Sequence, residues 1–180
     1  IDYVSSDIDY GYDEDWTFTG FDVAGYSSTD LYSRNIDTVT LDLRLLSRDG
    51  EGLAAGKVDW VVGFYALDRQ VDLTRQYTYL ANNFTSDFDV DRIALYGEVS
   101  GELAGGLRLS VGLRVEEHSS NYSDSESVSF TPDDNLLGGR VLLEKVLGNE
   151  NLLYASLTRG YKSGGFNTSG SLDTDLRLFD

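Results

Sequence analysis

The sequence predicts an all-β fold: an antiparallel up-and-down transmembrane β-barrel segment with about ten strands of a larger barrel. Apolar and polar residues alternate over long stretches, which places one set of side chains on each face of a strand. Short, glycine-rich connections alternate with longer polar ones. Charged residues recur on only one of the two faces. These features favour a barrel wall with one face toward lipid and the other toward a wet lumen.

The alternation is clearest in three segments, 39–45, 93–100 and 107–115, where every odd position but one carries an aliphatic residue. An apolar run at 135–147 is ambiguous, and we assign it to a strand because two adjacent glycines oppose a helix there. The expected strands are 3–10, 16–25, 37–47, 57–80, 90–103, 106–119, 125–131, 136–147, 150–162 and 171–178.

Short and long connections between the expected strands alternate along the chain. Three of them look short and are rich in Gly or Asn, as tight hairpins require: 47–57, 102–106 and 148–151. Three are longer and polar: 80–90, 119–134 and 163–174. Outer-membrane barrels show the same alternation, with short turns on the periplasmic side and long loops on the extracellular side. The long 57–80 strand is expected to project past the bilayer, with a bulge or the membrane boundary near 68–70.

The charges predict which face meets lipid. In 107–115 the odd positions are Leu or Val, whereas the even positions include two arginines. A charge on the lipid face costs about 2–4 kcal/mol at the bilayer midplane, so the charged face is expected to line the lumen. The residues predicted to point inward are Arg44, Glu98, Arg108 and Arg114.

Composition excludes several classes of protein. The net charge of −17 disfavours nucleic-acid binding, because such binders must neutralise phosphates. The chain has no Cys and a single histidine, His118, which excludes thiolate and multi-histidine metal sites. No stretch approaches the roughly 20 consecutive apolar residues of a transmembrane helix. The chain contains no Met and no signal peptide, so we expect a fragment or a processed product.

No catalytic residue, cofactor or metal site is predicted. The acidic run of Asp7, Asp9 and 13–15 lacks the spacing of an EF-hand and is expected to be a solvated loop. Asp87, Asp89 and Asp91 could bracket a cation, but a solvated stretch is favoured, and His118 is expected at the barrel rim. The chain carries no G-x-S-x-G nucleophile elbow, and we do not expect an enzyme.

The segment 151–167, which reads NLLYASLTRGYKSGGFN, resembles a recurrent barrel strand of TonB-dependent outer-membrane receptors. Segments 60–65, 96–99 and 107–115 resemble earlier strands of the same barrels, in the same order, so the resemblance covers about 37–167. One departure is Gly139-Arg140, where many relatives carry Pro followed by Arg or Lys. The specific part of the motif comprises Arg159, Gly160, Tyr161, Lys162, Gly164, Gly165 and Phe166.

The resemblance implies that 1–180 is part of a receptor barrel domain without the plug domain and the C-terminal strands. The whole protein would lie in the outer membrane of a Gram-negative bacterium, in contact with lipid. It would take up a bulky nutrient, most often a ferric siderophore, with energy supplied by TonB acting on the plug. Four aromatic residues expected near the extracellular rim could stack on the ligand: Tyr77, Tyr79, Tyr122 and Phe166.

Two alternatives stay open at this point. A complete small outer-membrane barrel with a structural or adhesive role would show the same alternation and hairpins. A soluble β-sandwich that serves as a binding module would show them as well.

Overall fold

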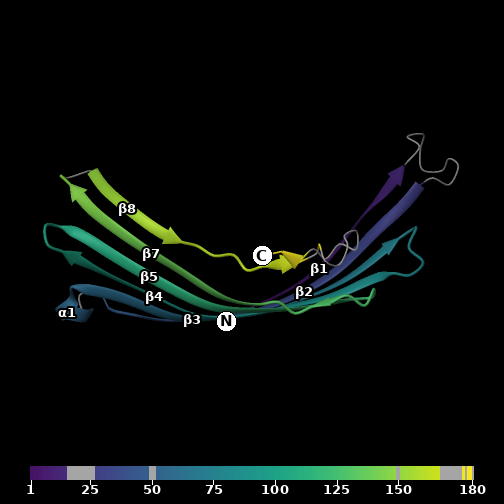
Figure 1. Ribbon diagram of the computed structural model, residues 1–180, viewed down its shortest axis with the longest axis horizontal. Coiled ribbons are helices and arrows are strands. Elements are labelled where there is room, and N and C mark those ends of the chain that lie inside the picture. The colour runs from purple at the N-terminus through teal and green to yellow at the C-terminus, as the bar shows by residue number, and fades with distance from the viewer. Residues whose placement is uncertain (16–26, 49–51, 149–150, 167–175, 177, 180) are drawn as a thin grey trace.

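The computed structural model describes residues 1–15, 27–48, 52–148, 151–166, 176 and 178–179. They form a curved antiparallel sheet of eight strands in the order β1-β2-β3-β4-β5-β7-β8, with β6 paired to β5 (Figure 1). The strands are β1 (Asp2–Asp15), β2 (Ser27–Leu46), β3 (Val58–Tyr77), β4 (Phe84–Leu103), β5 (Leu107–Asp124), β6 (Ser129–Phe130), β7 (Asp133–Leu147) and β8 (Asn151–Arg159).

The all-β antiparallel fold is confirmed, but the prediction of about ten strands is wrong, because the sheet has eight. The expected strand 16–25 and most of 171–178 lie outside the described residues. The expected strand 125–131 contains only the two-residue β6. A separate short pair joins β9 (Gly165–Phe166) to β10 (Leu178–Phe179).

Five strands (β1, β2, β4, β5 and β7) extend beyond their predicted bounds at their polar ends, whereas β3 and β8 are shorter than the predicted 57–80 and 150–162. β2, β3 and β4 each contain 20 residues, whereas about 9–11 tilted residues cross a bilayer. Much of 84–90 and 119–124, expected as loop, therefore belongs to β4 and β5. Their backbone groups are satisfied by the neighbouring strand, which does not require apolar side chains. The strands thus continue beyond the part that hydropathy alone identifies.

The register is continuous along every long pair of strands. β3 pairs with β2 from Val61 to Tyr77 and with β4 from Val58 to Arg75, without an inserted residue on either side. The expected bulge near 68–70 is therefore absent from these pairings. One face of β3 instead changes there from apolar, at Ala66, to acidic, at Asp68.

The predicted alternation of short and long connections holds only in part: 104–106 is short, but the connection expected to be long after β3 consists only of 78–83 (Figure 1). The turn between β4 and β5 uses Gly105 and Gly106 at φ +79 and +71, values that suit glycine. The connection between β2 and β3 is longer than a tight hairpin, because it contains the helix α1 (Leu53–Gly56). In the described residues no helix is long and apolar enough to cross a membrane.

The two faces of the curved sheet differ in chemistry. The C-terminal segment lies within the curve (Figure 1), and its Tyr161 contacts Arg114 and Glu116, which identifies their face as the concave one. The convex face carries a broad apolar band without a covering layer among the described residues. Its exposed members include Leu43, Leu45, Val62, Ile93, Leu95, Val99, Leu113, Val115, Leu137, Val141, Leu153 and Leu157.

The convex face becomes acidic beyond the apolar band, toward the end of the sheet opposite the short turns. β3 carries Asp68 and Asp72 there, and β4 carries Asp87, Asp89 and Asp91. Burial and then the neighbouring Asp87 raise the pKa of Asp89 above its ordinary value. This region faces water more favourably than hydrocarbon, so the apolar band alone has the character of a lipid-facing surface.

Candidate functional site: the concave face

The four residues predicted to point inward all lie on the concave face, and each has a partner there. Arg44 pairs with Asp42 of its own strand. Glu98 accepts from Arg140 at 2.8 Å, which joins β4 to β7 across β5. Arg108 donates to Ser100 at 2.9 Å and lies 3.4 Å from Asp59. Arg114 pairs with Glu116 at 2.6 Å. The charges of this wall are thus largely compensated within the sheet.

Arg114 lies at the centre of a polar and aromatic cluster. Its guanidinium sits 5.1 Å from the ring centroid of Tyr65 and 5.7 Å from that of Tyr96. Its Nε donates to the hydroxyl of Tyr161 at 2.7 Å, and that hydroxyl donates to Glu116 at 3.0 Å. Tyr65 and Tyr96 therefore contact the cation on the concave side of the sheet.

Glycines on three strands leave room for long side chains of neighbouring residues to lie against the backbone of the sheet, because glycine has no Cβ. A Cβ on Gly63 would come 2.1 Å from the Tyr96 ring, and one on Gly138 would come 2.8 Å from the Tyr161 ring. Both rings therefore rest directly on backbone. Gly112 lies between Glu98 and Arg140 on the neighbouring strands, and a Cβ there would meet the Glu98 carboxylate at 3.2 Å. Small residues at these positions thus shape the concave wall.

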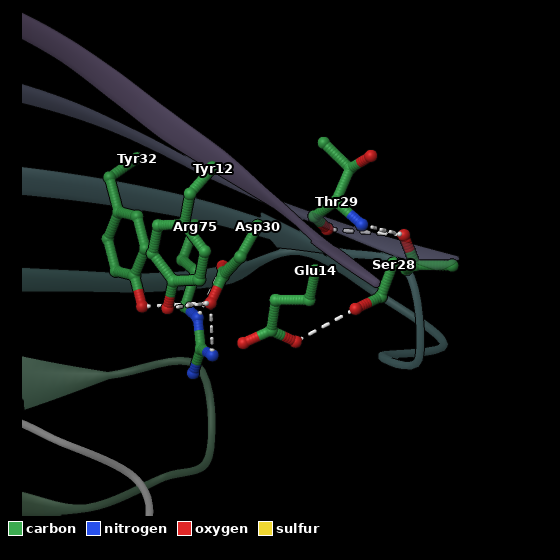
Figure 2. Close-up of polar contacts among 8 residues, drawn as sticks. Tyr12, Glu14, Ser28, Thr29, Asp30, Tyr32 and Arg75 are labelled. Atoms are coloured by element: carbon green, nitrogen blue, oxygen red, sulfur yellow. Dashed lines mark hydrogen bonds and ion pairs between the residues drawn. The ribbon is translucent and has the colours of Figure 1, made fainter. Parts of the chain in front are cut away.

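A second cluster surrounds Asp30 of β2, beyond the apolar band (Figure 2). Arg75 of β3 donates to its two carboxylate oxygens at 2.8 and 2.6 Å. The hydroxyls of Tyr12 and Tyr32 each donate to Asp30 at 3.1 Å. Asp30 is 1% exposed. The hydrogen bonds from Arg75 hold the pKa of Asp30 below its ordinary value, and burial raises the pKa of Tyr32. We call these four residues the rim cluster.

Two of the four predicted ligand aromatics adjoin the rim cluster. The Arg75 guanidinium lies 5.1 Å from the Tyr77 ring centroid, and Tyr77 meets Tyr79 edge to face at 5.5 Å. Tyr79 is exposed, so its ring is available to a bound molecule. Tyr77 and Tyr79 therefore form an aromatic surface beside the Arg75–Asp30 ion pair, and the exposed Tyr79 ring makes it accessible to a planar group.

The other two predicted ligand aromatics lie apart. Tyr122 is fully buried on β5, where it stacks on Phe130 and donates to Asp124 at 2.9 Å. In this position its ring supports the β5–β6 hairpin, and contact with a ligand would require that hairpin to open. Phe166 belongs to β9, where its backbone pairs with Leu178. A ligand role for either residue stays a prediction.

The residues of the C-terminal motif separate into three parts. Arg159 ends β8 opposite Gly139, and the space around Gly160 is open. Tyr161 turns onto the concave face, followed by the exposed Lys162. The backbone N–H of Gly164 donates to Asp134 at 3.0 Å, and Gly165 begins β9. Tyr161 and Gly164 therefore both contact the sheet through hydrogen bonds.

Two expectations about polar residues are wrong. His118 is not at the rim: it lies within β5, 5% exposed, on the concave face. The acidic positions Asp7, Asp9 and Asp13 are not in a loop but in β1, paired with β2. No group of three or more His, Asp or Glu side chains in the described part of the chain is arranged to hold a metal ion.

Sequence reasoning missed the rim cluster. Asp30 and Tyr32 lie before the expected strand 37–47, in a polar stretch without apolar alternation. A usable signal was the even spacing of Ser28, Asp30, Tyr32 and Arg34, which continues the concave face of β2 past the apolar band. The partner Arg75 could not be assigned without the register, because it is 45 residues away.

No family model matches the chain, and no curated protein matches it. Solved structures do. The ferric yersiniabactin uptake receptor FyuA from Yersinia pestis has a TM-score of 0.66 at 18% identity, over 81% of this chain and 24% of that one. The unliganded ferric citrate transporter FecA has a TM-score of 0.63 at 17% identity, and the match covers 78% of this chain and 22% of that one. The alcaligin outer-membrane receptor FauA from Bordetella pertussis has a TM-score of 0.56 at 16% identity, and the match covers 98% of this chain and 31% of that one.

The chain spans about a quarter of the length of the first two receptors. At this level of identity the likeness concerns the fold, and it agrees with a long-stranded sheet that has one apolar and one charged face. The chain therefore has the fold of part of the barrel wall of TonB-dependent siderophore receptors.

Proposed function

We propose that the chain is a segment of a TonB-dependent outer-membrane receptor that takes up a bulky nutrient, and that the nutrient is a ferric siderophore. The observation that carries this proposal is the contrast between the two faces of one curved sheet. The convex face offers aliphatic side chains to lipid, and the concave face offers ion pairs and tyrosines to a wet interior. The fold shared with siderophore receptors supports it.

The edges of the sheet support a larger barrel. In the described residues, no strand pairs with the outer edge of β1 or of β8. Unpaired backbone groups are not tolerated in the hydrocarbon core, so further strands of the same protein would complete the wall. The concave face would then line the lumen, where the protein's own plug domain would contact Arg44, Glu98, Arg108 and Arg114. TonB would act through that plug.

The two alternatives fit the sheet less well. A complete small barrel requires its first and last strands to pair, whereas β1 and β8 have no pairing with each other. A soluble sandwich requires a second sheet over the apolar face, and in the described residues nothing covers the convex band. The transport function needs no covalent chemistry, and the matched receptors are transport proteins rather than enzymes.

The ligand would be received at the rim, with Tyr77, Tyr79 and Arg75 as its contacts on this segment. The test uses the full-length protein and a deletion strain of its Gram-negative host. We expect the strain to lose growth in iron-limited medium on one ferric siderophore, and the purified protein to bind that siderophore. Normal growth on every siderophore tried, together with no binding by the purified protein, would refute the iron assignment.

A further inference from the structure

We infer that the concave face carries an oxyanion-binding site, formed by Arg92 of β4 and His118 of β5, which takes a carboxylate or phosphate group. The two residues are directly opposite in the antiparallel pairing and share the concave face. Cβ atoms of such pairs are about 4.5–5.5 Å apart, so one small anion can contact both side chains. The inference stands independently of the transport function proposed above.

Both side chains present buried nitrogen atoms without hydrogen-bond partners in the described part of the chain. These atoms are Arg92 Nε and His118 Nδ1. Buried polar groups in proteins are almost always satisfied. The guanidinium can only donate, and a neutral imidazole whose N–H is on Nδ1 donates as well, so in that tautomer a group made only of acceptors can serve both residues. A carboxylate or a phosphate has that character.

The carboxylates nearest to the pair accept hydrogen bonds from other groups. Glu116, two residues from His118, binds Arg114 and Tyr161. Asp134, opposite His118 on β7, accepts from the backbone of Gly164. Arg92 consequently makes no ion pair with any described residue. Arg92 therefore lacks the direct ion pair that Arg44, Arg108, Arg114 and Arg140 make, although its charge still interacts with the Glu116 carboxylate.

A further cation stands beside the pair. Arg69 of β3 is opposite Val90, two residues from Arg92, so it is a diagonal neighbour on the concave face. It is exposed and has no ion pair among the described residues. Burial, and next the charge of Arg92, lower the pKa of His118, which keeps its imidazole neutral at pH 7. The positive charge at this site thus comes from the two arginines, while the carboxylates of Asp134, Glu116 and Asp133 act on His118 in the opposite direction.

The test follows the imidazole nitrogens of His118 directly. The full-length protein, labelled with ¹⁵N-histidine and held in detergent micelles, would be titrated with sodium acetate and, separately, with sodium phosphate. Sodium chloride would keep the ionic strength constant at pH 7.5. The His118 ring signal would be assigned by its loss in His118→Gln. We expect it to shift saturably with acetate, with phosphate or with both, and the arm that saturates identifies the anion.

Variants separate this site from general charge effects. Arg92→Leu should weaken the apparent affinity at least tenfold, and Arg92→Lys should weaken it less. Arg44→Leu is the matched control, since Arg44 is also a concave-face arginine but is paired with Asp42, and it should leave the affinity unchanged. A His118 signal that fails to saturate with either anion, or an unchanged affinity in Arg92→Leu, would overturn the inference. If Arg92→Leu does not fold, the wild-type titration and Arg92→Lys still decide the matter.

Discussion

Replacing Asp30 with Asn tests whether the rim cluster stabilises the polar half of the sheet. The substitution keeps the shape of the side chain but removes the charge that two guanidinium nitrogens of Arg75 contact at 2.8 and 2.6 Å. Removing one partner of a buried ion pair costs about 3–5 kcal/mol. The Arg75 side chain is 29% exposed, so water recovers part of that loss. Asn also retains one acceptor, and we expect a net loss of about 2 kcal/mol.

The assay is a guanidinium chloride titration of the full-length protein in lipid vesicles, followed by tryptophan fluorescence. Asp13→Asn is the matched control, because Asp13 lies in the same pair of strands and its carboxylate accepts only an exposed hydrogen bond from Thr29. We expect the control to change the stability by no more than about 0.5 kcal/mol. Equal midpoints for the two variants would show that the Arg75–Asp30 pair does not contribute as argued.

The same variant predicts a pH dependence with a definite sign. The pKa of Asp30 is lowered in the folded protein, so its stabilisation is fully present above the ordinary pKa, near 3.8, and is lost as the pH falls through the folded value. The difference between wild type and Asp30→Asn should therefore be constant near neutrality and vanish in strong acid. A difference that persists below the folded pKa would assign the effect to packing instead.

Three further predictions concern other parts of the sheet. Gly63→Val should displace the Tyr96 ring and lower the free energy of unfolding by about 1–3 kcal/mol, whereas Gly160→Ala, which meets open space, should be neutral in the same titration. Tyr77→Ala should weaken siderophore binding about tenfold, measured by fluorescence quenching, and an unchanged affinity would remove Tyr77 from the ligand site. Asp89→Asn should stabilise the protein at pH 7 by some tenths of a kcal/mol, because the raised pKa of Asp89 reflects a cost of its charge. That gain should disappear below the ordinary pKa of Asp, and a gain that persists in acid would contradict the electrostatic cause.

Much of the fold was predictable from the sequence, and the errors share one cause. Segments 107–115 and 93–100 alternate because one face meets an apolar medium, and that pattern identified β5 and β4. Where both faces of a strand are polar, hydropathy does not alternate, and the ends of those strands were therefore expected to be loops. The strands continue there because cross-strand backbone hydrogen bonds are satisfied whatever the side chains. His118 was misplaced for the same reason.

The sequence by itself determined which side chains share a face. Leu113 and Arg114 lie on opposite faces because successive Cβ atoms alternate along any strand, which is a local property of the backbone. Only the tertiary structure decided which residues meet across strands. Asp30 meets Arg75, and Arg92 faces His118, because register brings together positions 45 and 26 residues apart. Register depends on the pairing of whole strands, and neither partner's local sequence contains it.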